Sequence, residues 1–506
     1  MLKLSSLASA ALALALPAQS IDLAVEGGSI GGQLQIRMSG GTPGQVGFIF
    51  LSFNSGPTPL AFLDPSDPRS LSVGLDLLSL TVASVLLVPP EIVVPPLPIP
   101  NSPALIDGAM FFQAATVPGF TNLVDQLSLP RAVRFGPSNG FRDRFVALAN
   151  PRSFFPAIPT ADGRTLIAGG GAGALFAQIA RKDTEWFDPI SDSFSAGQDM
   201  TIERSLHTAT RLQDGRWLIV GGVDRLNDPT PTAEIFNPAT GAFTAVRSMA
   251  LQRAGHAAAL LPNGRVLVSG GITDMNAPNS ALDPVYSITA TTEIYDPVAD
   301  TWTAGPALRK PRAGHVALTR GDGRVLLAGG VSWYTFIVRL PSLESTTDLY
   351  TPASNTIAAG PAMRQARAVP AMVATGAGRW LLAGGIGNLS LTQQGTPTAA
   401  AEVYDEAANS FTATGSMAQA RAICQLFPIG NNRYLVIGGG DGTLFAVTPL
   451  ASSEIWTSTT GAWTPGPALT RPRVAYGAYA TASGQVHVIG GDSTAGVDLS
   501  SEFYYR

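Results

Sequence analysis

Hydrophobic and polar positions from about residue 137 onward follow one pattern that returns seven times. Each copy begins with an arginine, alternates between apolar and polar residues, passes a polar turn and ends an apolar run with Gly-Gly. The clearest copies are RSLHTATRLQDGRWLIVGG at 204–222, RAGHAAALLPNGRVLVSGG at 253–271 and RAGHVALTRGDGRVLLAGG at 312–330. In every copy the first glycine lies 17 residues after the arginine. A fixed period of about 50 residues indicates a repeat architecture.

A second phrase follows each Gly-Gly pair, in forms such as AEIFNP and TEIYDP. Its acidic residues are Glu185, Glu234, Glu293, Asp348, Glu402, Glu454 and Glu502. The alternating stretch predicts a first strand, and Asp-Gly or Asn-Gly predicts a tight hairpin turn because both tolerate positive φ. The apolar run, such as residues 266–268, predicts a second strand buried on both faces. The acidic phrase predicts a third strand, and an aromatic residue about nine positions later marks a fourth.

The seventh copy has no such aromatic residue before Arg506. A closed ring of sheets leaves no raw strand edge, so the missing strand must come from elsewhere in the chain. The segment just before the first copy, residues about 139–149 with Phe141, is the candidate. We therefore predict that it pairs with the C-terminal strand.

Residues 21–136 lack the repeat phrases and contain neither histidine nor cysteine. Short apolar runs separated by Gly-, Pro- and Ser-rich turns predict a small accessory domain resembling a β-sandwich. The segment VPPEIVVPPLPIPNSP at 88–103 is too rich in proline for a central strand, so we expect an extended edge strand or a connector.

Residues 1–20 have the pattern of a secretory signal peptide. Lys3 precedes the apolar stretch from Leu7 to Leu16, and Ala18-Gln19-Ser20 fits a cleavage site. The pattern predicts a secreted or cell-envelope protein, periplasmic or extracellular, with no membrane span once the peptide is removed. A single membrane anchor is the alternative. Export together with a lone cysteine, Cys424, favours a bacterial envelope protein over a disulfide-linked ectodomain.

Net charge of −4 and a charged fraction of 13% argue against a nucleic-acid partner.

The Gly-Gly pairs, the acidic-x-aromatic-Asp-Pro phrases and the spaced Trp or Phe resemble kelch motifs. The subtype with R-x-x-H and D-G-R-V-L is similar to the central propeller of the galactose oxidase family. This resemblance implies an all-β chain in which residues 137–506 form a seven-bladed kelch-like β-propeller. Because propellers host unrelated activities, it says little about function.

Nearly all length variation between the copies lies in the connection between strands two and three. In a ring these connections share one face, and variable loops on a rigid scaffold commonly carry recognition. The longest follow Gly271 and Gly330. Their candidate binding residues are Asp274, Asp283, Tyr286, Trp333, Tyr334 and Phe336. Such aromatic residues suit stacking on sugar rings or contact with a protein; alternatively, they pack on neighbouring loops.

His207, His256 and His315 occupy one equivalent position in three successive copies, and Cys424 occupies it in another. Together they are candidate ligands for zinc or copper; the alternative is that each hydrogen-bonds within or between blades. The copper site of the galactose oxidase family needs two tyrosines, two histidines, a cysteine–tyrosine thioether and a ligand from a later domain. That pattern is not matched here, and we predict no cofactor.

The repeated arginines either line a channel and bind acidic sugars, as the resemblance to kelch-type sialic acid epimerases suggests, or cap backbone carbonyls between blades. The sequence favours an exported, non-enzymatic binding or scaffold protein that recognises a glycan or another envelope protein. The alternative is a carbohydrate-active enzyme, either epimerase-like or copper oxidase-like.

Overall fold

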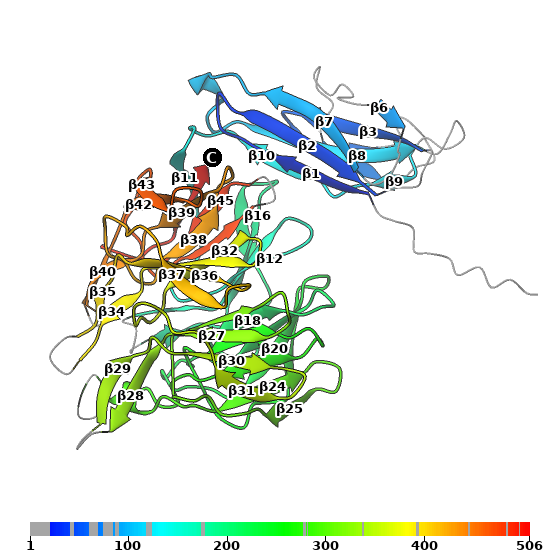
Figure 1. The fold of residues 1–506 in the computed structure, drawn as a ribbon. Helices are drawn as coiled ribbons and strands as arrows, with labels where there is room; N and C mark the ends of the chain where they lie inside the picture. Colours follow the sequence, from blue (N-terminus) through cyan, green and yellow to red (C-terminus); the bar gives the residue numbers. More distant parts are fainter. Residues whose placement is uncertain are drawn as a thin grey trace, which may run out of the picture. The chain divides into compact units, whose positions relative to one another are not determined.

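The computed structural model describes residues 21–506 apart from 41–44, 60–68, 74–83, 87–90, 118–123, 174–177, 277–279, 281, 336–338, 391–393, 444–445, 482–483 and 495. The signal peptide predicted for residues 1–20 lies outside the described residues. The chain divides into two compact units, an N-terminal unit, Met1–Phe135, and a C-terminal unit, Gly136–Arg506. Both are built from antiparallel strands, which confirms the all-β prediction (Figure 1).

The C-terminal unit contains seven four-stranded sheets among its described residues, each with its strands in the order in which they pair. The first sheet consists of β12 (Ala157–Pro159), β13 (Thr165–Ala168), β16 (Thr184–Asp188) and β17 (Ser193–Ala196). The second consists of β18 (Thr208–Arg211), β19 (Trp217–Val220), β20 (Ala233–Asn237) and β21 (Ala242–Val246). The third consists of β22 (Ala257–Leu260), β23 (Val266–Ser269), β24 (Thr292–Asp296) and β25 (Thr301–Ala304). The next two are β26 (Val316–Thr319), β27 (Val325–Ala328), β30 (Thr347–Thr351) and β31 (Thr356–Ala359); and β32 (Ala371–Gly376), β33 (Arg379–Ala383), β36 (Ala401–Asp405) and β37 (Ser410–Ala413). The last two are β38 (Gln425–Pro428), β39 (Arg433–Ile437), β42 (Ser453–Thr457) and β43 (Ala462–Pro465); and β44 (Gly477–Ala480), β45 (Val486–Ile489), β48 (Ser500–Tyr505) and β11 (Gly140–Ala147). The first six sheets therefore each have the four strands predicted from one copy of the repeat.

The seventh sheet takes its outer strand from the start of the unit. In the register of β11 on β48, Phe141 lies opposite Tyr504 and Asp143 opposite Glu502. The prediction that residues about 139–149 pair with the C-terminal strand is confirmed.

Backbone hydrogen bonds join each repeat to the next. The second glycine of every Gly-Gly pair donates its N–H to the carbonyl of the next repeat's arginine, and the seventh pair closes the series when Gly491 donates to Arg152 at 3.0 Å. The other six bonds run from Gly170 to Arg204, Gly222 to Arg253, Gly271 to Arg312, Gly330 to Arg367, Gly385 to Arg421 and Gly439 to Arg473. The first glycines have positive φ, and a Cβ on Gly270 would lie 2.1 Å from the Arg312 oxygen. Only glycine fits such an approach.

The core lies between neighbouring sheets. Leu218 and Val220 of β19 pack with Val266 and Val268 of β23, and each side chain is almost fully buried. The same kind of cluster joins the first sheet to the seventh, since Ile167 contacts the group that contains Ile489 and Phe503. The continuous apolar runs of the sequence are therefore strands covered on both faces.

Five of the connections between strands two and three carry a small hairpin, and the longest carries the only α-helix among the described residues. The hairpins are β14 (Gly171–Ala172) with β15 (Ile179–Ala180), β28 (Val331–Thr335) with β29 (Arg339–Leu343), β34 (Ile386–Asn388) with β35 (Thr396–Pro397), β40 (Gly440–Thr443) with β41 (Ala446–Pro449), and β46 (Asp492–Ser493) with β47 (Gly496–Val497). The helix is α1 (Asp283–Tyr286). No helix in the described part of the chain has the length and apolar character needed to cross a bilayer.

In the N-terminal unit, residues of two sheets share one core. The first sheet is β1 (Asp22–Glu26), β2 (Gln33–Ser39) and β7 (Glu91–Pro98); the second is β10 (Arg131–Arg134), β8 (Ala109–Val117), β3 (Val46–Ser52) and β6 (Ser84–Leu86), with β9 (Gln126–Leu127) beside β8. A further pair is β4 (Ser55–Pro59) with β5 (Ser70–Val73), and a 3-10 turn spans Pro103–Leu105. Leu23 and Ile36 of the first sheet pack with Phe112 and Val133 of the second. The proline-rich β7 lies at the edge of its sheet, as predicted.

Candidate functional site

The seven repeat arginines are buried inside the sheets and are bound by their own repeats. Each guanidinium donates to the carbonyl of the first glycine of its Gly-Gly pair, as Arg204 does to Gly221 at 2.9 Å. Arg204 also forms an ion pair with Glu234, with 2.8 Å between Nε and Oε1, and both side chains are 0% exposed. All seven repeat arginines are 0% exposed, so their guanidinium groups do not face a channel where a ligand could reach them. The arginines thus cap backbone carbonyls, but these carbonyls belong to their own repeats and do not lie between repeats as predicted.

The acidic residue of each repeat also accepts a hydrogen bond from the backbone. In six repeats its other oxygen accepts an N–H from the connection that enters the sheet, as Glu234 does from Thr201 at 2.8 Å and Glu293 from Ala250 at 2.7 Å. In the fourth repeat one oxygen of Asp348 accepts from both the Arg312 guanidinium and the Arg309 N–H. The arginine–carboxylate pair thus fixes the connection between successive sheets. The fixed spacings in the sequence reflect this structural role.

The histidines at the equivalent repeat position are also buried. The Nε2 atom of His256 lies 2.9 Å from the Thr208 hydroxyl, and that of His315 lies 2.8 Å from the Ser269 hydroxyl, so each ring contacts the preceding sheet. Burial, together with the nearby Arg253, lowers the pKa of His256 to about 3, and burial lowers the pKa of His207 to about 3 as well. The described residues contain no group of three or more His, Cys, Asp or Glu side chains placed to hold a metal ion. The structure thus does not bring the metal candidates together. It favours the hydrogen-bonding alternative for His256 and His315, whereas neither ring nitrogen of His207 has a hydrogen-bond partner among the described residues.

The depressed pKa of His256 predicts acid sensitivity. A histidine with a pKa near 6.5 when unfolded and about 3 when folded stabilises the fold fully above pH 6.5, and this stability is lost as the pH falls toward 3. Between pH 7 and pH 5 the loss amounts to about 2 kcal/mol for one such residue. Urea unfolding at both pH values should show a drop smaller by about this amount in a His256→Gln variant. Equal drops in variant and parent would refute the assignment.

Cys424 occupies the equivalent position in the sixth repeat. Its side chain is 7% exposed, and burial raises the pKa of the thiol to about 11. A thiol is reactive or ligates a metal as the thiolate, so this one is held in its inert form.

A ring of unusual backbone conformations lies next to these residues. The second residue after each repeat arginine has positive φ in all seven repeats. They are Phe154, Leu206, Gly255, Gly314, Val369, Ile423 and Ala475, with φ between 44° and 60°. Several are joined by backbone hydrogen bonds: Phe154 donates to Ala475 at 2.8 Å and Val369 to Gly314 at 2.7 Å. For side chains other than glycine this conformation costs roughly 1–2 kcal/mol per residue.

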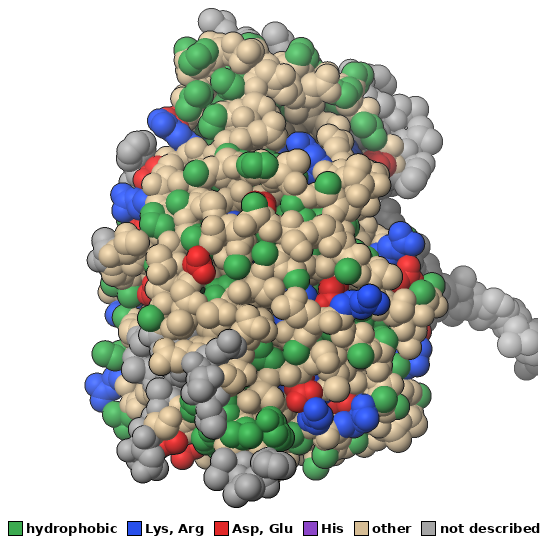
Figure 2. All heavy atoms as spheres, turned by 60° about the vertical axis from the view of Figure 1, so that its left-hand side comes forward, with side chains coloured by type: hydrophobic (Ala, Val, Ile, Leu, Met, Phe, Trp, Pro, Cys, Tyr) green, Lys and Arg blue, Asp and Glu red, His purple; other side chains and the backbone are tan. Residues whose placement is uncertain are grey.

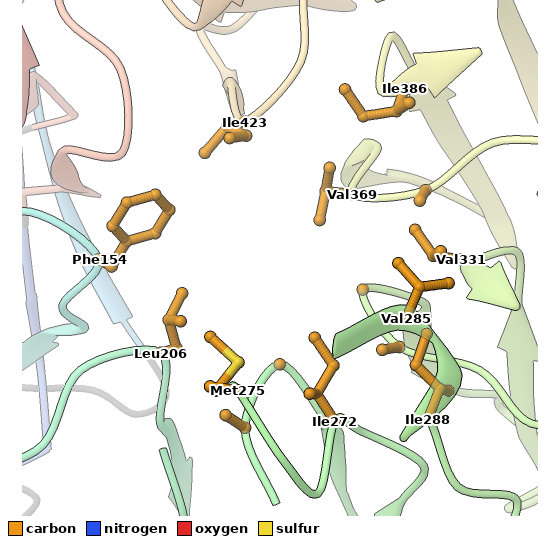
Figure 3. A pocket seen from close by; sticks show the side chains of 15 residues that line it. Phe154, Leu206, Ile272, Met275, Val285, Ile288, Val331, Val369, Ile386 and Ile423 are labelled. Atoms are coloured by element: carbon orange, nitrogen blue, oxygen red, sulfur yellow. The ribbon is translucent and has the colours of Figure 1, made fainter. Parts of the chain in front are cut away.

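Six of these residues, all except Ala475, line an apolar pocket of about 190 Å³, shown in Figure 3. Its wall is completed by residues that follow the arginines or the Gly-Gly pairs and by three side chains of the connection after Gly271, namely Met275, Val285 and Ile288. The pocket is therefore lined in part by a connection between strands two and three, the kind of segment in which recognition is predicted. The side chains that this connection contributes are apolar and are not among the predicted binding residues.

The predicted binding residues are partly brought together. The Trp333 indole donates to the Ile288 carbonyl at 3.3 Å, the Arg339 guanidinium lies 4.6 Å from the centre of its ring, and Arg339 donates to the Tyr286 carbonyl at 3.2 Å. The hairpin β28–β29 and helix α1 thus form one packed group, which we call the rim platform (Tyr286, Trp333, Tyr334 and Arg339). In this group Tyr334 is 52% exposed.

The other predicted residues contribute less. Asp274 is exposed, but its Oδ1 accepts from the backbone N–H of Asn276 at 2.8 Å and shapes its own loop. Asp283 is half-buried, and its Oδ2 accepts the Ser280 N–H at 3.1 Å, which fixes the entry to α1. Phe336 lies outside the described residues.

The pocket-lining residues were missed in the sequence. Their signal is the apolar or glycine residue two positions after each arginine, which reads as part of the repeat. These residues are about 50 positions apart in the sequence, so their meeting is visible only in the folded structure.

Comparisons with known proteins support the fold. No family model matches the chain, and no curated protein matches it. A fungal alcohol oxidase of the AA5 family, solved in complex with copper, superposes with a TM-score of 0.56 at 17% sequence identity, over 73% of this chain and 76% of the oxidase chain. The structure of YjhT matches 63% of this chain and 98% of its own, with a TM-score of 0.47 and 16% identity. At this identity the likeness to the oxidase shows a shared all-β fold and nothing about activity.

The described residues that line the pocket do not offer ligands for a copper ion of the kind that the oxidase holds. The pocket wall consists of apolar side chains and glycines, without nitrogen, thiolate or phenol ligands. Tyr476, which occupies the repeat position equivalent to Cys424, donates its hydroxyl to the Ile437 carbonyl at 2.6 Å and is buried. No step through a copper centre follows from this arrangement.

Proposed function

We propose that this chain is an exported, non-enzymatic binding protein. In this proposal residues 137–506 form a seven-bladed kelch-like propeller, and residues 21–136 form an accessory domain resembling a β-sandwich. The seven four-stranded sheets and the hydrogen bond from Gly491 back to Arg152 support the propeller. The core shared by two sheets supports the sandwich. Export to the cell envelope or the medium rests on the predicted signal peptide.

The rim platform is the proposed binding surface, and the observation that carries it is the way its aromatic residues are held. Trp333 is fixed by the Ile288 carbonyl on one side and by Arg339 on the other. Tyr334 follows on the same strand and projects about half of its surface. A rigid aromatic side chain binds at little cost in conformational entropy, and its ring can stack on a sugar or pack against an apolar side chain of a protein.

Charge on this side of the molecule agrees with such a ligand. On the face shown in Figure 2, which brings β28 and β29 forward, positive and negative side chains are scattered and mixed. A nucleic-acid surface is typically a continuous basic patch. The proposed partner is therefore a glycan or another envelope protein.

Replacing Tyr334 with alanine should weaken binding at least tenfold without changing the melting temperature by more than about 2 °C, because the ring is half exposed and outside the core. The measurement is a glycan array with the purified protein, together with capture of envelope proteins, followed by titration of the strongest ligand. Val298→Ala is the matched control, because Val298 is 96% exposed and lies between strands three and four, away from the platform. Equal affinity of the two variants for that ligand would reject the platform.

A carbohydrate-active enzyme, epimerase-like or copper oxidase-like, remains the second candidate on the strength of the shared fold. The epimerase-like alternative requires repeat arginines that line a channel and bind acidic sugars, but the side chains of Arg204 and Arg253 are 0% exposed. The same protein preparation, supplied with copper and assayed for alcohol oxidation and for sugar epimerisation, separates the classes. Turnover that survives Tyr334→Ala would favour the enzyme.

A further inference from the structure

The apolar pocket has a wall that is chemically uniform. All of the side chains around it are apolar or glycine, and Figure 3 shows them arranged around one opening. The wall is drawn from six of the seven repeats, and the third of them includes the connection that carries Val285 and Ile288. Both of these residues are almost fully buried, so this connection is packed firmly against the rest of the wall.

The backbone of the wall has little hydrogen bonding left to offer. Ala254 and Ile272 exchange both of their backbone hydrogen bonds, at 2.9 and 2.8 Å. Ala313 with Val331, and Ala368 with Ile386, do the same. A sugar hydroxyl placed here would give up its water without finding a partner, which is unfavourable. The chemistry of the pocket therefore selects against glycans and charged groups.

The strained backbone conformation of two wall residues indicates that large side chains are required at these positions. Gly255 and Gly314 show that glycine serves at this repeat position, where φ is positive. Val369 and Ile423 occupy the same position with φ of 44° and 53°, although β-branched residues rarely adopt such values. Their side chains line the pocket. Strained conformations of this kind cluster where function requires them.

We infer that this pocket binds a small, uncharged, hydrocarbon-like ligand. Its volume of about 190 Å³ sets the size. An engineered apolar cavity of about 150 Å³ lined by similar side chains stays dry and binds benzene. A substituted benzene ring or a short branched alkyl group therefore fits. This site is distinct from the rim platform, and its existence does not depend on the proposed function, because Tyr334 takes no part in its wall.

The test uses 4-fluorotoluene as the probe and follows its ¹⁹F NMR signal during titration into the full-length protein. We expect saturable binding with one site per chain. The double variant Val369→Gly, Ile423→Gly removes two wall side chains at positions where glycine is free of strain, so the fold is retained. Its affinity for the probe should fall at least tenfold.

Ala475→Gly is the matched control. Ala475 has the same backbone conformation, with φ of 55°, but does not line the pocket. Its affinity should stay within twofold of the parent. Absence of saturable binding to the parent protein overturns the inference, and so does an equal loss of affinity in the control and the double variant. Competition of the probe by glucose would also overturn it, since it would show a polar site.

Discussion

Replacing residues 141–147 with a glycine-serine sequence of the same length is expected to unfold the C-terminal unit or to lower its free energy of unfolding by more than about 5 kcal/mol. The strand β11 is the only partner of β48 on its outer side. Phe141 is 9% exposed, and its ring centre lies 5.3 Å from that of Tyr504. Loss of one buried phenylalanine costs about 3–5 kcal/mol, and each lost ladder hydrogen bond adds about 1 kcal/mol. Whole domains have only about 5–15 kcal/mol to lose.

Thermal unfolding followed by circular dichroism measures this effect. The control is the same replacement at residues 441–447, in the small hairpin β40–β41, which pairs with no strand of the four-stranded sheets. That variant should lose no more than about 2 kcal/mol, in the ordinary range for single changes outside the core. Should both variants melt close to the parent, the first and last strands would not be what closes this unit.

The repeat could be predicted from the sequence because its parts obey local rules with fixed spacing. The 17-residue interval from arginine to glycine is the distance that lets a guanidinium reach the carbonyl at the end of the second strand of its own sheet, as Arg312 reaches Gly329 at 2.8 Å. The Gly-Gly pair is required by the approach of the next repeat's carbonyl. An insertion would disrupt both the hydrogen bond from the guanidinium to the carbonyl and the close approach at the Gly-Gly pair. The spacing is therefore the same in every copy and can be recognised in the sequence.

The candidate site could be predicted only in part, because its geometry depends on contacts without periodicity. Whether Trp333 is exposed or packed is decided by Arg339 and by the helix α1, which no repeat position encodes. The direction of the His256 ring is set by Thr208 in the neighbouring sheet, 48 residues away. The apolar pocket requires residues from six repeats to meet. Sequence patterns show which residues vary, but only the closed arrangement shows which of them face one another.

The ion pair between Arg204 and Glu234 is the interaction within a repeat whose loss we expect to destabilise the fold strongly. The guanidinium is fully buried, donates to Glu234 at 2.8 Å and also donates to the carbonyls of Gly221 and Thr232, at 2.9 and 3.0 Å. The same carboxylate accepts the Thr201 N–H in the connection between the first and second sheets. Removing the carboxylate would therefore leave a buried positive charge and a backbone donor without their acceptor.

Glu234→Ala is consequently expected to destabilise the C-terminal unit by about 3–5 kcal/mol, the usual cost of breaking a buried pair by removing one partner. Glu234→Gln should cost less, because an amide oxygen still accepts one hydrogen bond. The control is Asp214→Ala, which breaks the half-exposed pair with Arg216 and should cost no more than about 1 kcal/mol. Urea unfolding followed by circular dichroism compares the three variants. An effect of Glu234→Ala as small as that of Asp214→Ala would mean that the pair is a by-product of packing; the expected gap would show that one carboxylate per repeat holds successive sheets together.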